Sequence, residues 1–188
     1  MSSFVVVLDA CTLFPASLRD TLLRAAEAGL YRLQLTDDIL EEVRRNLILK
    51  KGMQEEKAFR LINVIKEQFP ESLVSQHRQI ISSMTNDEKD RHVLAAAVVC
   101  RAQTIVTQNL KDFPAENLAP FDIEAQSPDD FLINLFHLGP YILIRILIDQ
   151  ANELRNPPRT VPELLETLEL HVPIFIKLVR KMLEVQPH

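Results

Sequence analysis

Short apolar runs rich in β-branched residues alternate with longer amphipathic stretches over the first two thirds of the chain. The clearest runs are residues 4–8 (Phe-Val-Val-Val-Leu) and 104–107 (Thr-Ile-Val-Thr), whose apolar character is typical of strands buried on both faces. Residues 31–35, 73–75 and 121–125 are shorter strand candidates, the last at a sheet edge. This alternation predicts an α/β fold with a mostly parallel sheet and helices on its faces.

The helical stretches lie between these runs in the first part of the chain, and the last part is predicted to be helical throughout. Apolar residues at helical spacing extend over residues 13–30, 38–51, 54–69 and about 86–101. From residue 127 onward the pattern is helical throughout, starting at Ser127 with a proline at the first helical position. We therefore expect a domain over residues 1–125 and an all-helical extension over residues 126–188.

Glycine is scarce in this chain. Gly29, Gly52 and Gly139 are the only glycines in 188 residues, and no two of them can share one turn. A dinucleotide-binding fingerprint and a phosphate-binding P-loop both need clustered glycines. A nucleotide-binding loop that holds phosphates with backbone amides is therefore disfavoured, and any catalysis must come from side chains.

The charge distribution says more than the net charge of −5, which by itself argues mildly against a nucleic-acid partner. Residues 44–66 hold seven basic residues against two acidic ones. Such a run is either a solvated helix face or a surface for phosphate contact, and the sequence leaves both open. Cys11 and Cys100 form no metal-binding cluster, and no apolar run reaches the ~20 residues of a membrane span, so we expect a cytoplasmic protein without a membrane partner.

Acidic side chains stand where a parallel sheet places its ligand sites. Asp9 directly follows the first strand, at the carboxyl edge of the sheet. A helical wheel puts Asp90 in the middle of an apolar stripe and Glu42 beside the stripe of its own helix, whereas Glu41 points away. An ionised carboxylate facing a core is costly unless a cation or hydrogen-bond donors meet it.

Two further oxygen-bearing side chains, Asn109 and Asp112, follow the strand at residues 104–107. Oxygen donors that converge from several strand ends and helices are suited to Mg²⁺ or Mn²⁺ and are poor ligands for zinc. The combination predicts a hard-cation site.

Each acid also has an ordinary structural explanation. Asp9 suits a turn or a helix cap, and Asp87 and Asp90 suit the first turn of a helix. A single glutamate such as Glu42 is most often solvated. The cation-site hypothesis therefore depends on their joint placement. His92 falls on the side of the wheel away from Asp90, and we expect it to be an ordinary exposed or packing histidine.

Four segments resemble, in order, the motifs of PIN-domain nucleases. They are residues 5–15 (VVVLDACTLFP), 36–45 (TDDILEEVRR), 87–97 (DEKDRHVLAAA) and 105–114 (IVTQNLKDFP). The resemblance implies a compact three-layer α/β/α PIN-like fold and Mg²⁺- or Mn²⁺-dependent cleavage of RNA. The helical extension resembles, more loosely, that of some VapC-type toxins, which are held inactive by an antitoxin protein and are commonly homodimers.

The resemblance also implies roles for individual residues. Asp9, Glu42 and Asp90 match the family's catalytic acids, with Asp9 and Asp90 as metal ligands. Glu42 would orient or deprotonate a water molecule or complete the metal shell. Many family members carry aspartate at the position of Asn109, so Asn109 or Asp112 would supply the remaining metal ligand.

Substrate contacts are expected beside these acids. Thr12 is a polar neighbour of Asp9, and the basic stretch that begins with Arg44 and Arg45 would grip the RNA backbone.

Two alternative functions would account for parts of this pattern. A PIN-like module that binds a protein partner without catalysis is favoured by the loss of charge at Asn109. A phosphatase of the haloacid-dehalogenase type is disfavoured, because it would carry a second aspartate where this chain has Cys11.

Overall fold

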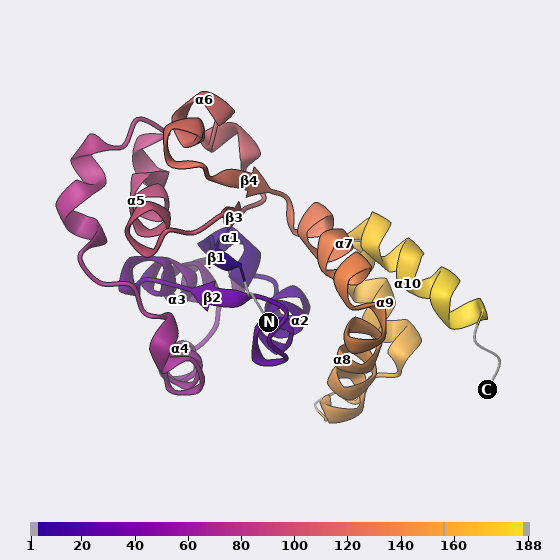
Figure 1. The fold of residues 1–188 in the computed structure, drawn as a ribbon. Coiled ribbons are helices and arrows are strands. Elements are labelled where there is room, and N and C mark those ends of the chain that lie inside the picture. Colours follow the sequence, from indigo (N-terminus) through magenta and orange to yellow (C-terminus); the bar gives the residue numbers. More distant parts are fainter. Residues whose placement is uncertain (1–3, 156, 186–188) are drawn as a thin grey trace. The chain divides into compact units, whose positions relative to one another are not determined.

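The computed structural model describes residues 4–155 and 157–185, and four parallel strands form its central sheet (Figure 1). The strands lie in the order β2-β1-β3-β4. Their bounds are Val5–Leu8 (β1), Arg32–Gln34 (β2), Thr104–Val106 (β3) and Glu124–Gln126 (β4). Because Leu8 pairs with Val106 in parallel, Asp9 and Thr107 leave the sheet side by side at one edge.

Ten α-helices are found in the described part of the chain. They are α1 (Ala10–Leu13), α2 (Ala16–Glu27), α3 (Asp37–Lys51), α4 (Glu55–Gln68), α5 (Arg91–Cys100), α6 (Ala115–Leu118), α7 (Pro128–Leu138), α8 (Pro140–Glu153), α9 (Val161–Glu169) and α10 (Pro173–Val185). Short 3-10 helices connect them at Pro70–Ser72 (η1), His77–Ser83 (η2), Glu88–Asp90 (η3), Leu110–Asp112 (η4) and Ala119–Phe121 (η5). The predicted α/β class, with a parallel sheet followed by helices alone, is confirmed.

Local chemistry explains where α3 begins and ends. The Thr36 side chain accepts a hydrogen bond from the backbone N–H of Ile39, and Gly52 ends the helix at a φ of 63°. A hydroxyl N-cap and a left-handed glycine are the usual signals for these two positions. They place Glu41 and Glu42 in the first turns of a rigid helix.

Three sequence predictions were wrong in detail. The helix expected over residues 13–30 is shorter, α2 (Ala16–Glu27), because Pro15 has an extended conformation with a ψ of 123° and separates it from α1. The strand expected at residues 73–75 is only an isolated bridge between Leu35 and Leu73. The helix expected from residue 86 begins at Arg91, after the 3-10 turn η3.

Contacts divide the chain into two compact units. Unit 1 comprises Met1–Phe14 and Tyr31–Gln126, and unit 2 comprises Pro15–Leu30 and Ser127–His188. The sheet and every predicted catalytic acid belong to unit 1. Residues 15–30, which include α2, group with the C-terminal helices, and the division into domains at residue 126 remains a prediction.

Unit 2 has its own helical core. In it α2 packs against α8 and α9, and Thr21 donates a buried hydrogen bond of 2.7 Å from its hydroxyl to Gln150 Oε1. None of the described helices is by itself long and apolar enough to cross a membrane; α7 and α8 reach that length and hydropathy only as a pair, and they meet at a bend of 118°.

Candidate active site

Asp9 is held in place by the end of the neighbouring strand. Its side chain is buried, with 3% of the residue exposed, and Oδ2 accepts hydrogen bonds from Thr107 Oγ1 (2.7 Å) and Cys11 Sγ (3.0 Å). The Thr107 hydroxyl oxygen in turn accepts a bond from the backbone N–H of Asn109 (3.0 Å). Burial and the nearby Asp9 raise the pKa of Cys11 to about 12, so its thiol stays protonated and keeps donating.

Asp90 lies where several carboxylates meet. Burial and the negative charges of Asp9, Asp112, Glu42 and Asp87 raise its pKa to about 6. Like charges that share a partly desolvated site favour the protonated form of one of them. These acids come from separate segments of the sequence, and Glu42 and Asp112 line the same cavity as Asp90.

Backbone bonds join the two loops that carry these acids. The backbone N–H of Asp87 donates to the Asp112 carbonyl at 3.4 Å, and Asn86 Nδ2 donates to the same carbonyl at 3.4 Å. Asn86 is buried. The turn before α5 and the turn after β3 are thus tied together.

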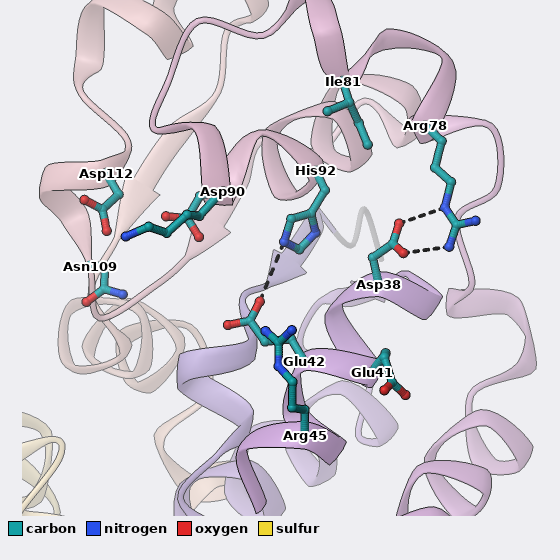
Figure 2. Close-up of a pocket in the computed structure, with 11 residues that line it drawn as sticks. Asp38, Glu41, Glu42, Arg45, Arg78, Ile81, Asp90, His92, Asn109 and Asp112 are labelled. Carbon is teal, nitrogen blue, oxygen red and sulfur yellow. Dashed lines mark hydrogen bonds and ion pairs between the residues drawn. The ribbon is translucent and has the colours of Figure 1, made fainter. Parts of the chain in front are cut away.

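A cavity of about 770 Å³ opens in front of these loops (Figure 2). Asp90, Asn109 and Asp112 lie together on one side of it, and Glu42 and Arg45 approach from α3. The structure therefore brings five of the predicted site residues to one cavity. Both candidates for the fourth acidic position, Asn109 and Asp112, line it.

Glu42 has a partner that the sequence pattern did not predict. His92 Nε2 lies 3.7 Å from Glu42 Oε2, and this contact is the main cause that holds the pKa of Glu42 below its ordinary value, against the opposing effect of burial (Figure 2). The expectation that His92 faces away from the acids was wrong. The helical wheel assumed one continuous helix, but residues 88–90 form a 3-10 turn with a different angle per residue.

The three residues predicted to contact the substrate differ in their burial and in their bonding partners. Thr12 is fully buried, and its hydroxyl donates to the backbone carbonyl of Asp9 at 2.8 Å, so it supports the turn after β1. Arg44 is bound to Glu41 (2.7 Å) and Glu55 (3.1 Å). Arg45 is exposed and lines the cavity.

Other cations of the basic stretch are also engaged. Lys66 pairs with Asp37 at 2.6 Å, and the ammonium groups of Lys50 and Lys51 lie 5.9 and 5.5 Å from the centroid of the Phe14 ring. Arg44 and Lys66 are thus ion-paired, whereas Arg45 lines the cavity.

A further polar cluster forms one wall of the cavity. Asp38 accepts hydrogen bonds from Arg78 Nε (3.0 Å) and Nη2 (2.6 Å), and His77 Nε2 lies 2.7 Å from the same carboxylate. These partners, Arg78 first, lower the pKa of Asp38 to about 2. No short-range pattern predicts this cluster, because its members are 39 and 40 residues apart.

The donor set suits a hard divalent cation. Carboxylate and amide oxygens are the ligands that Mg²⁺ and Mn²⁺ prefer, and the raised pKa of Asp90 indicates an excess of negative charge that a cation would relieve. Within the described residues, no group of three His, Cys, Asp or Glu side chains is arranged to hold a metal ion. The fit therefore lies in donor chemistry and charge.

Two family models match separate segments of the chain. Residues 5–111 match a family model described as PIN domain, and residues 128–181 match one described as VapC50 C-terminal domain. A protein of Mycobacterium tuberculosis named "Putative ribonuclease VapC50" is 41% identical over 106 residues, which are 56% of this chain and 63% of that protein. The chain thus spans less than two thirds of the relative's length. No solved structure was found to match.

Proposed function

The chain belongs to the PIN-domain family, and on this premise we propose that it is an endoribonuclease that hydrolyses RNA phosphodiester bonds with Mg²⁺ or Mn²⁺. The observation that carries the proposal is that Glu42, Asp90 and Asp112 line one cavity, which is large enough for part of a polynucleotide. The VapC50 relative is named as a ribonuclease, which supports RNA as the substrate.

Asp9, which does not itself line the cavity, would act together with the residues that do. Asp9 and Asp90 would hold the principal cation, with Asn109 or Asp112 as the next ligand. A bound divalent cation supplies positive charge at the scissile phosphate and makes a water molecule more acidic. Glu42, whose carboxylate contacts His92, would align the attacking water or take its proton. Arg45 would contact a backbone phosphate.

A second candidate function is a PIN-like module that acts through a protein partner without catalysis. It is favoured by Asn109, which carries no charge where many family members have an acid. Such a module would bind Mn²⁺ or RNA and leave every RNA intact.

The biological role that fits this family is the toxin of a toxin–antitoxin pair. The match of residues 128–181 to a VapC50 C-terminal domain supports a VapC-type toxin. We therefore propose a cognate antitoxin as protein partner, a homodimer as the assembly and the cytoplasm as the compartment.

The proposal is tested by removing single charges from the acids. Asp9→Asn and Asp90→Asn should each abolish Mg²⁺- or Mn²⁺-dependent cleavage of RNA, measured on gels with tRNA and ribosomal RNA among the substrates. Asp122→Asn is the matched control, since Asp122 is exposed and its φ of 55° is one that asparagine tolerates. Circular dichroism should be unchanged in all three variants. Full activity in either active-site variant would refute the assignment.

A further inference from the structure

A second hollow lies directly beside the acidic cavity. It has a volume of about 540 Å³, and it lies between α3, α4 and Arg78. Asp38, Glu41 and Arg78 line both hollows. A chain-like ligand that occupies the acidic cavity would therefore find a continuous path over Arg78 into the second hollow.

The second hollow offers an exposed aromatic ring beside an apolar floor. Phe59 is 58% exposed, whereas Leu40 and Ile62 beneath it are buried. Phe59, Ile62 and Asn63 recur at helical spacing on α4, so they share the face that lines the hollow. A large exposed ring with a neighbouring amide suits a ligand that has a flat face and a hydrogen-bonding edge, as a nucleobase has.

The cations around the hollow differ in whether they have hydrogen-bond donors that are not already bound to an acid. Arg44 and Lys66 are each bound to acids of the hollow itself. Arg78 presents the Nε–Nη2 edge of its guanidinium to Asp38. A guanidinium has five N–H donors, and across the described residues no hydrogen bond of Nη1 is found. The Nη1–Nη2 edge thus has the geometry to bind a phosphate with two parallel hydrogen bonds.

Arg78 is also held rigidly enough to serve as a fixed contact. The buried His77 shares Asp38 with it, and Gln76, just before them, has a φ of 69°. A residue other than glycine is kept in this left-handed region only where surrounding contacts enforce it. Two successive side chains are thereby directed at one carboxylate.

We propose that the second hollow is a nucleotide subsite for single-stranded RNA, in which Phe59 stacks on a base and Arg78 binds the phosphate that connects it to the acidic cavity. This inference rests on the proposed nuclease function. It identifies a second place, apart from the bond that is cut, where the protein binds its RNA substrate. It also explains how a chain with few aromatic residues can grip a flexible strand.

The test measures binding of fluorescent oligouridylates to the full chain by anisotropy, in an Asp90→Asn background that prevents cleavage. Phe59→Ala and Phe59→Leu should weaken binding of an oligomer of about 12 nucleotides by about tenfold, whereas Phe59→Tyr, which keeps the ring, should not. Arg78→Ala should lower the salt dependence of log K by about 0.7.

Val64→Ala is the matched control, because Val64 is 40% exposed on the same helix and does not line the hollow. Unchanged affinity of Phe59→Ala for the longer oligomer overturns the subsite, and the proposed function stands if the original chain still cuts RNA. A chain that neither binds nor cuts RNA overturns both. If Phe59→Ala no longer binds a protein partner but keeps its affinity for RNA, the subsite is also overturned.

Discussion

Asp90 carries a carboxyl group whose charge is opposed by its surroundings. Because its pKa is raised to about 6 in the folded chain, the ionised form is destabilised there relative to the unfolded chain. This loss of folding stability is absent below about pH 4, where Asp90 is protonated in both the folded and the unfolded chain. It reaches its full size above about pH 6. The same repulsion is what would make a cation bind at this place.

We expect Asp90→Asn to stabilise the metal-free protein at pH 8. After allowance for solvent screening of a half-buried group, the gain should be about 1 kcal/mol, and it should vanish near pH 4. Urea denaturation in the presence of a chelator measures it, with Asp122→Asn as the control. A stability difference between the original chain and the Asp90→Asn variant that is independent of pH would contradict the charge cluster.

At the scale of elements, the segment between α4 and α5 is attached to α3 by Asp38. Asp38 binds both His77 and Arg78 of η2, and η2 packs against α5. The lowered pKa of Asp38 means that the ionised form stabilises the fold, and that this contribution is present above about pH 4 and is lost as the pH falls toward about 2.

Asp38→Asn should therefore destabilise the protein by about 1 kcal/mol at pH 7, and by progressively less as the pH falls below about 4. Asp37→Asn is the matched control, since Asp37 lies in the same first turn of α3 and pairs with Lys66 at the surface. Thermal unfolding monitored by circular dichroism between about pH 3 and pH 7 gives both curves. Equal effects of the two variants would show that the helix terminus, not the His77–Arg78 cluster, is responsible.

At the scale of the whole molecule, α2 belongs by its contacts to unit 2 although it lies early in the sequence. Leu18, Leu22 and Ala25 of α2 are fully buried, and α2 packs against α8 and α9. Removing the C-terminal helices would expose this apolar face to water.

A chain truncated after residue 126 should therefore bind the dye ANS and form assemblies larger than the proposed homodimer, whereas the full chain should not. Light scattering and dye fluorescence measure the two effects. If the face of α2 is the cause, replacing Leu18 and Leu22 by serine in the truncated chain should abolish the larger assemblies. A truncated chain that neither binds the dye nor forms larger assemblies without these changes would support an independent domain over residues 1–125.

Much of the architecture could be predicted because it depends on local patterns. Strand β1, helix α3 with its Thr36 cap and helix α4 follow from periodicity and capping residues. The position of Asp9 at the carboxyl end of a parallel strand follows from the same reasoning. The position of His92 could not be predicted, because one 3-10 turn at residues 88–90 changes the direction of every later side chain relative to Asp90.

The α/β class, strand β1, helices α3 and α4 and the position of Asp9 after a strand can be read from the amino-acid sequence, because the patterns that predict them are local. The three-dimensional fold was needed to show that Asp38 binds residues 39 and 40 positions away, that Glu42 meets His92, and that α2 joins the C-terminal helices. Pairing and electrostatic repulsion depend on distances in space, and those distances are set by packing between segments that are remote in the sequence.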